Sequence, residues 1–203
     1  MEQQQRRVTQ KGQRARSALV EAALAVFSKS GYGSASVADI VDSAGLTKNH
    51  LFYHFGSKEA LAAAALEQAL AIWRNELAMP AEVFPDSARR LGFCIRRLSE
   101  GSLQAQYRLL AAMRLDRSAL PDELAAQVDS YETELVEFWR RLLKGLKGEG
   151  SAAPKMKARA MATAITWQLC GAAIADDGKN GMFAAQVAFI GSLLGDGGGQ
   201  LSS

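Results

Sequence analysis

Apolar residues recur every three or four positions along most of this 203-residue chain, which is the spacing of one face of an α-helix. The longest such series, with successive intervals of 4, 3, 4, 3 and 4 residues, is Leu124, Val128, Tyr131, Leu135, Phe138 and Leu142. No stretch shows the alternation of apolar and polar residues that is typical of a half-buried strand. The pattern therefore predicts an all-α protein.

The inventory of reactive side chains argues against an enzyme or a metal protein. Cys94 and Cys170 are isolated, so no CxxC metal or redox motif is present. His50 and His54 are the only histidines, and they lack both a third ligand nearby and an HExxH motif. We find no set of nucleophile, base and orienting group and no glycine-rich phosphate loop. We expect no catalytic residues, no metal and no cofactor.

The distribution of apolar residues also bears on location. Runs without a charged residue do not exceed 16 residues, whereas a bilayer-spanning helix needs about 20. The first residues, MEQQQRRVTQKGQRAR, contain no apolar segment of the kind found in a secretory signal. We therefore expect a cytoplasmic protein with no membrane partner.

The positive charge is concentrated at the start of the chain. Residues 1–58 hold eight basic and four acidic side chains, whereas the remainder holds 16 basic and 17 acidic ones. Such asymmetry indicates either a solvated basic tail or a segment that binds an anionic partner such as nucleic acid. Residues 1–16 have no apolar periodicity, so we expect a flexible basic arm that either aids solubility or follows the minor groove of DNA.

Two short helices joined by a tight turn follow a first helix that ends near Gly31. Ser36 and Asp39 form a capping-box pattern at the start of the first short helix. Gly45 permits the turn, and Thr47 caps the next helix, which runs to about His54. This order is typical of a helix-turn-helix, whose second helix enters the major groove of DNA.

The exposed positions of that second helix carry side chains suited to DNA. Its first turn holds Thr47, Lys48, Asn49 and His50. Lysine donates to guanine acceptors and asparagine pairs with adenine. Tyr53 and His54 have polar tips that can reach phosphate, and Lys58 adds a cation at the start of the following helix. We expect Tyr53 to be exposed, because Phe52 and Phe55 satisfy the core.

The segment YGSASVADIVDSAGLTKNHLFYHFGSKEAL, residues 32–61, resembles the DNA-binding region of TetR-family transcriptional regulators, and the similarity extends over roughly residues 14–66. The resemblance implies an all-α homodimer of about nine helices, with a three-helix DNA-binding domain and a larger C-terminal domain for effector binding and dimerisation. The expected division is an arm over 1–16, a helix-turn-helix domain over 17–56 and a C-terminal domain over 57–203, linked by the helix 57–78. It further implies that DNA is contacted by Ser36, Thr47, Lys48, Asn49, His50, Tyr53, His54 and Lys58.

Two positions depart from the family pattern. Asn49 stands where the family often has glycine, and Phe52 stands where it commonly has tyrosine, so we interpret Phe52 as a packing residue. The segment QLCGAAIADDGKNGMF resembles the last two helices of the family, which form the dimer interface. The candidate interface residues are Gly171, Ala172, Phe183, Val187 and Ile190. The alternative is that the small residues line a buried helix face.

An effector pocket in a helical bundle is expected to be apolar with few polar anchors. The candidate lining residues are Trp73, Tyr107, Arg108, Met113, Arg114, Trp139, Trp167, Gln168 and Cys170. Each of these residues can equally well be an ordinary core or surface residue that lines no pocket. Arg108 and Arg114 either meet an anionic effector or form salt bridges, with Asp116 or Glu100 as the partners within reach.

These observations favour a sequence-specific transcriptional regulator. We expect a ligand-released repressor that binds a pseudo-palindromic DNA operator as a homodimer and responds to a small-molecule effector. Two alternatives remain, which are an activator of the same family and an architectural DNA-binding protein without sequence preference.

Overall fold

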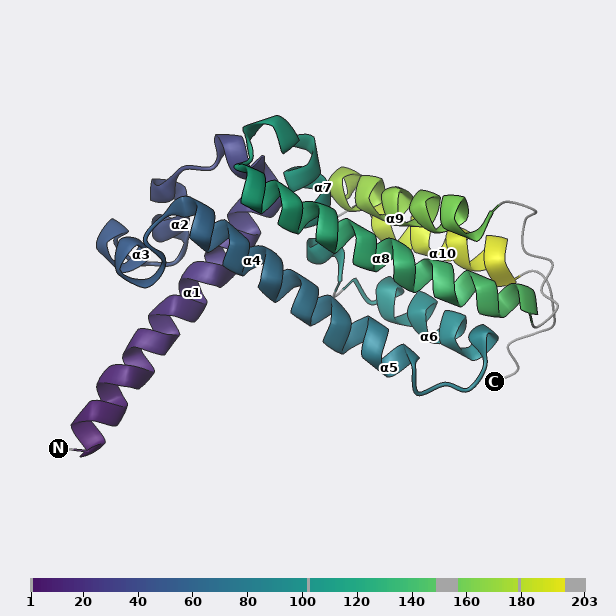
Figure 1. Cartoon of the computed structure of the whole chain (residues 1–203), viewed down its shortest axis with the longest axis horizontal. Coiled ribbons are helices and arrows are strands. Elements are labelled where there is room, and N and C mark those ends of the chain that lie inside the picture. Colours follow the sequence, from purple (N-terminus) through teal and green to yellow (C-terminus); the bar gives the residue numbers. More distant parts are fainter. Residues whose placement is uncertain (1, 102, 149–156, 179, 196–203) are drawn as a thin grey trace.

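The computed structural model describes residues 2–101, 103–148, 157–178 and 180–195, and every regular element within these ranges is a helix (Figure 1). The prediction of an all-α fold is confirmed. The α-helices are α1 (Glu2–Ser34), α2 (Val37–Ser43), α3 (Lys48–Phe55), α4 (Lys58–Trp73), α5 (Met79–Ala81), α6 (Ser87–Ser99), α7 (Gln104–Leu115), α8 (Asp122–Gly148), α9 (Ala158–Ala175) and α10 (Met182–Gly195). A π-helix, η1 (Arg74–Ala78), joins α4 to α5, and a 3-10 helix, η2 (Arg117–Ala119), follows α7.

Helix α1 differs from the expectation of a flexible arm over residues 1–16. It begins at Glu2, and its N-terminal half projects away from the other helices (Figure 1). The arm is rich in glutamine and arginine, which are good helix formers, and it directly precedes a segment whose apolar face is buried. That buried segment provides the nucleus on which further turns are added at little cost. Met1 lies outside the described residues.

The α1–α3 unit packs around the apolar face that the sequence pattern predicts. Val20, Ala23 and Phe27 of α1 are buried, as are Ile40 of α2 and Leu51 of α3. The predicted capping box is present, because the Ser36 hydroxyl accepts the Asp39 N–H at 3.1 Å and the Asp39 carboxylate accepts the Ser36 N–H at 2.9 Å. These contacts bring α2 and α3 together beside the start of α4 (Figure 1).

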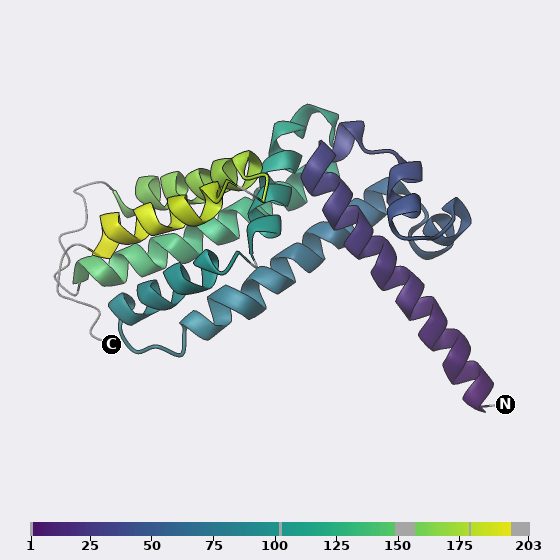
Figure 2. The same ribbon diagram turned by 180° about the vertical axis from the view of Figure 1, so that it is seen from behind.

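The C-terminal bundle consists of α6 to α10 packed along the second half of α4 (Figure 2). The predicted seam of α8 is buried along its whole length, from Leu124 to Leu142. Helix α4 was expected to stop before Pro80, but the chain stays helical to Ala81. In η1 the Met79 N–H bonds to the Arg74 carbonyl, and this wider turn relieves the clash that a proline ring makes in a regular α-helix. No described helix is both long enough and apolar enough to cross a membrane.

The end of α1 rests against the end of α7. Gly31 interrupts the α1 helix with φ 74° and ψ 179°, a conformation open essentially to glycine alone. The chain turns there toward Asp116, whose carboxylate Oδ2 accepts the Gly33 N–H at 2.8 Å. A Cβ atom at Gly31 would lie 2.2 Å from the same oxygen. Gly31 thus interrupts the helix near the predicted end of its first part, and it lies in a contact between distant parts of the chain.

This close approach predicts that Gly31→Ala lowers the free energy of unfolding by about 3 kcal/mol, the sum of backbone strain and displacement of Asp116. Gly45→Ala is the matched control, because Gly45 has φ 65° but nothing lies within 4 Å of its Cβ position. It should cost only about 1 kcal/mol. Urea denaturation of both variants measures the difference. Equal costs would show that Asp116 yields to the methyl group freely.

Candidate nucleic-acid interface

Helix α3 is held in place from its buried side. Leu51 is fully buried, and Phe55 packs at the edge of the same core beneath the Arg16 guanidinium, 5.1 Å from its ring centre. The turn before α3 is closed by the Leu46 N–H, which donates to the Val41 carbonyl at 2.8 Å. Gly45 takes the positive φ that this turn requires. The orientation of α3 is therefore set by α1 and α2.

The opposite side of α3 is an exposed face formed by Lys48, Asn49, Phe52 and Tyr53, which we call the α3 outer face. Tyr53 is 85% exposed, as expected, but Phe52 is 51% exposed, so its interpretation as a packing residue is wrong. Phe52 and Tyr53 lie four residues after Lys48 and Asn49, which places all four on one side of the helix. The same spacing, applied from Lys48, would have identified Phe52. Lys48 and Asn49 make no hydrogen bond or ion pair with the residues that the structure describes.

His50 and His54 are placed differently from each other. His50 Nδ1 lies 3.3 Å from the Thr47 nitrogen, whose N–H it accepts, and 2.9 Å from Thr47 Oγ1. One ring nitrogen of His50 is thus used at the start of α3, and only Nε2 remains for another partner. His54 is half-buried, with its ring edge against Tyr53 and its Cε1 atom facing Gly12 of α1. His54 therefore packs toward α1, whereas His50 stays on the surface.

Ser36 is exposed but occupied. Its hydroxyl donates to Asp39 Oδ2 at 2.7 Å and accepts the Asp39 backbone N–H. These hydrogen bonds lower the pKa of Asp39 and keep its carboxylate charged. Ser36 thus acts first as the cap of α2.

Lys58 turns inward rather than toward the α3 outer face. Its Nζ donates to the Tyr32 carbonyl at 2.6 Å and lies 4.2 Å from the centre of the Tyr32 ring. Burial lowers the pKa of Lys58. The Tyr32 hydroxyl donates to the Glu59 carboxylate, and burial together with this hydrogen bond raises the pKa of Tyr32 to about 12. The Tyr32 carbonyl lies in the last turn of α1, where the Ser36 N–H donates to Asp39 instead, and Lys58 supplies it with a partner. The structure thus places Lys58 in the packing of α1 against α4, and its contact with DNA stays a prediction.

Five effector-pocket candidates are buried in the apolar core, and we call them the buried aromatic cluster. They are Trp73, Tyr107, Met113, Trp139 and Cys170. The Trp73 Nε1 donates to the Tyr107 hydroxyl at 3.3 Å, whereas the buried Trp139 Nε1, which also faces this hydroxyl, forms no hydrogen bond of good geometry with the described residues. Burial raises the pKa of the Cys170 thiol to about 12, so the thiol is unreactive.

The four remaining pocket candidates lie elsewhere. Arg108 donates to the backbone carbonyls of Ala173 and Asp176. Arg114 pairs with Asp129 at 2.7 Å and with Glu132 at 3.3 Å. The expectation that Arg114 forms a salt bridge is confirmed, but the expected partners, Asp116 or Glu100, are wrong. Trp167 donates to Glu132 at 3.1 Å, and the exposed Gln168 accepts from Gln186. Each thus has a partner outside the buried aromatic cluster.

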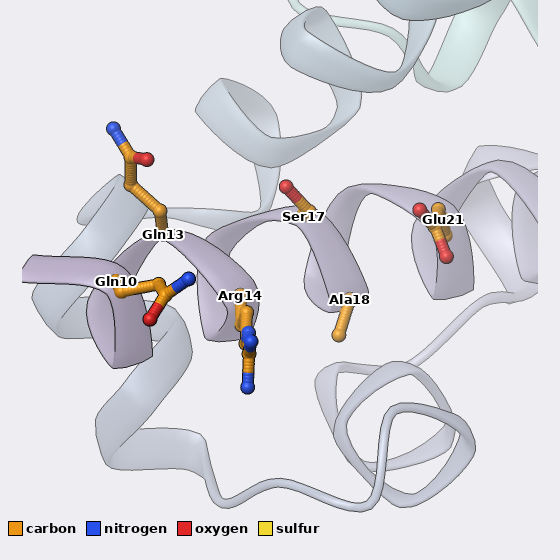
Figure 3. Close-up of a pocket in the computed structure, with 6 residues that line it drawn as sticks. All are labelled: Gln10, Gln13, Arg14, Ser17, Ala18 and Glu21. Carbon is orange, nitrogen blue, oxygen red and sulfur yellow. The ribbon is translucent and has the colours of Figure 1, made fainter. Parts of the chain in front are cut away.

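An open depression of about 470 Å³ follows one face of α1 (Figure 3). All of its lining comes from this single helix, namely Gln10, Gln13, Arg14, Ser17, Ala18 and Glu21. A hollow lined by one helix leaves a ligand largely in solvent, and none of these residues is an effector-pocket candidate. It therefore does not identify an effector site.

The candidate interface residues of the last two helices face mostly inward. Ala172, Phe183, Val187 and Ile190 are buried within the protomer, and only Gly171 is exposed. The prediction is corrected accordingly: the outward apolar residues are Ile174, Met182, Phe189 and Leu193. Helix α10 has no charged residue, so both of its sides are apolar and the sequence pattern does not distinguish them.

Comparison with known proteins bears on this geometry. The model of the bacterial regulatory proteins of the tetR family matches residues 19–65, the segment from the buried part of α1 to the start of α4. The chain is 32% identical over 139 residues to the HTH-type transcriptional regulator RutR of Escherichia coli O157:H7. The segment 19–65 belongs to the tetR family of bacterial regulatory proteins. This is a family of transcriptional regulators, not of enzymes.

The alignment with RutR covers 68% of this chain and 64% of RutR, slightly less than two thirds of that relative. The TetR fold extends over the whole bundle. A TetR-family regulator from Agrobacterium tumefaciens superposes with a TM-score of 0.78 at 20% identity, over 90% of this chain and 98% of that one. AibR, solved with isovaleryl coenzyme A and operator DNA, superposes with a TM-score of 0.70 at 17% identity, over 89% and 97%.

Proposed function

We propose that this TetR-family protein is a sequence-specific DNA-binding transcriptional regulator whose α3 lies in the major groove. The observation that carries the proposal is the α3 outer face. Its side chains, from Lys48, Asn49, Phe52 and Tyr53, are exposed to solvent, whereas Leu51 of the same helix is buried in the core and anchors it. A helix held rigidly on one side presents its other side in a defined register, which base recognition requires.

The chemistry of this face favours sequence recognition over an architectural role. Lys48 donates to guanine O6 or N7, and the Asn49 amide forms a bidentate pair with adenine. Phe52 offers an apolar surface to a thymine methyl group, and the Tyr53 hydroxyl reaches a phosphate. Architectural proteins that lack sequence preference rely on phosphate contacts and DNA deformation, and need no such base-reading groups.

We predict that Lys48→Ala and Asn49→Ala each weaken binding to the preferred operator by about 1–3 kcal/mol and relax base preference at one position. The operator is first selected from random double-stranded DNA by the wild-type protein. Fluorescence anisotropy at fixed salt then compares the selected DNA with random DNA.

Lys29→Ala is the matched control, because Lys29 is an exposed lysine of α1 that lies off the α3 outer face. It should leave base preference unchanged. Equal wild-type affinity for selected and random DNA would favour the architectural alternative. Unchanged operator affinity in both α3 variants would contradict the placement of α3 in the groove.

The second part of the proposal is a homodimer formed through the outer side of α9 and α10. Ile174, Met182, Phe189 and Leu193 are large apolar side chains, each between 43% and 53% exposed. An exposed apolar patch on a helix pair whose one charged residue is Arg159, at the start of α9, is typical of a subunit interface. A two-fold dimer places two copies of α3 on the half-sites of a pseudo-palindromic operator.

This interface predicts that Phe189→Glu shifts the dimer dissociation constant by about a hundredfold or more, because the carboxylate is buried without a partner. Val83→Glu introduces the same charge at an exposed apolar position after α5 and should leave the dimer intact. Sedimentation velocity measures both variants. A Phe189→Glu protein that remains a dimer would contradict the interface. Ala172 is unsuitable for this test, because a charge there would enter the protomer's own core.

The third part of the proposal is repression that is relieved by a small molecule bound at the buried aromatic cluster. The unpartnered Trp139 indole N–H supports it, because a ligand with a carbonyl or similar acceptor would satisfy this buried donor. The cluster contains no charged side chain, so it fits an uncharged ligand better than an anion. Release follows if the ligand binds more tightly to a conformation that does not fit the operator.

We expect that a molecule that raises the wild-type melting temperature and weakens operator binding binds Trp139→Phe about tenfold less tightly. The probes are a panel of uncharged small molecules with carbonyl groups, measured by thermal unfolding and anisotropy. Trp167→Phe is the control, because its indole already donates to Glu132 outside the cluster. A molecule that strengthens operator binding would favour the activator alternative. Equal affinity of the two tryptophan variants would place the ligand elsewhere.

A further inference from the structure

The α1–α3 unit and the C-terminal bundle meet at Asp116, which lies between α7 and η2. Its Oδ2 accepts the Gly33 backbone N–H at 2.8 Å, just after the break in α1 at Gly31. A Cβ atom at Gly31 would lie 2.2 Å from Oδ2, which is too close, whereas one at Gly33 would lie at the ordinary contact distance of 3.6 Å. The approach thus depends on glycine at the α1 end and on a carboxylate at the α7 end.

The loop that carries Asp116 is itself anchored to the bundle from both sides. Arg114 and Arg117 flank it, and they donate to opposite oxygens of Asp129 on α8 at 2.7 and 2.8 Å. Arg114 also pairs with Glu132, which accepts the Trp167 indole N–H from α9. A continuous series of polar contacts therefore joins the end of α1 to α8 and α9.

Two further connections join the two parts, namely α4, which continues through the π-helix η1, and the packing of α1 on α7. Packing between helices resists rotation of one part on the other, but it has no fixed pair of partner atoms. The hydrogen bond from Gly33 to Asp116 joins two defined atoms beside this packing and so favours one orientation.

We infer that Asp116 is a positioning residue for operator binding. It acts through Gly33 to hold the α1–α3 unit at one orientation on its bundle, and in a dimer this sets the separation of the two α3 helices. The inference rests on the proposed function of a dimer that reads two half-sites. Asp116 itself touches no DNA in this role, so its loss should affect the joint use of two half-sites and leave the reading of each one intact.

The test compares Asp116→Ala with wild type on an operator selected by the wild-type protein and on a single half-site of it. Full-operator affinity should fall about tenfold or more, while half-site affinity stays within about twofold. The variant should also bind an operator whose half-sites are moved apart by one base pair with about the same affinity as it binds the selected operator. Asp116→Asn retains an oxygen acceptor for the Gly33 N–H and should restore most of the full-operator affinity.

Asp122→Ala is the matched control, because Asp122 is an exposed carboxylate at the start of α8 with no described partner. Thermal unfolding of each variant monitors folding, since a merely structural role lowers stability and reduces both affinities together. Equal loss on full operator and half-site would overturn the positioning role while leaving the proposed function standing. A wild-type protein that selects no DNA would overturn both.

Discussion

The apolar face of α1 is the contact on which the rest of this structure depends. Its buried side chains, including Leu19, Ala23 and Phe27, pack against α2, α3, α4 and α7, so a single helix supports both the α2–α3 pair and the bundle. The apolar core is continuous from α1 to α10 as a result. Where α1 ends, Gly31 and Gly33 admit the Asp116 carboxylate, and the helix that organises the N-terminal unit is thereby tied to α7.

The exposed chemistry of α3 follows from that packing. Leu51 faces the core, so Lys48, Asn49, Phe52 and Tyr53 face solvent, and the four outward side chains supply the polar, apolar and hydroxyl groups that the proposed base and phosphate contacts require. The neighbouring residues stabilise the helices instead. Ser36 and His50 take part in helix caps, and Lys58 joins α4 to the last turn of α1. The division between reading and supporting residues is finer than the helix-turn-helix pattern alone implies.

The C-terminal bundle separates its two proposed roles in space. The buried aromatic cluster lies inside, with one indole N–H unpartnered, whereas the apolar side chains available to a second copy lie on the outer side of α9 and α10. The polar network through Arg114, Asp129, Glu132 and Trp167 lies between α7, α8 and α9. It connects α8 and α9 to the α7 end that carries Asp116, and through Asp116 to α1.

The sequence alone determined the helices, the capping box at Ser36, the glycine positions of the turns and the TetR family, because each depends on residues within a few positions of one another. It also determined that α8 buries one continuous seam. It did not determine which side of the uniformly apolar α10 faces inward, that Lys58 would fold onto the Tyr32 carbonyl, or which carboxylates Arg114 would meet. It also left open that residues 2–16 extend α1. Only the tertiary structure decided these, because they depend on partners far away in the chain, whose positions no local spacing encodes.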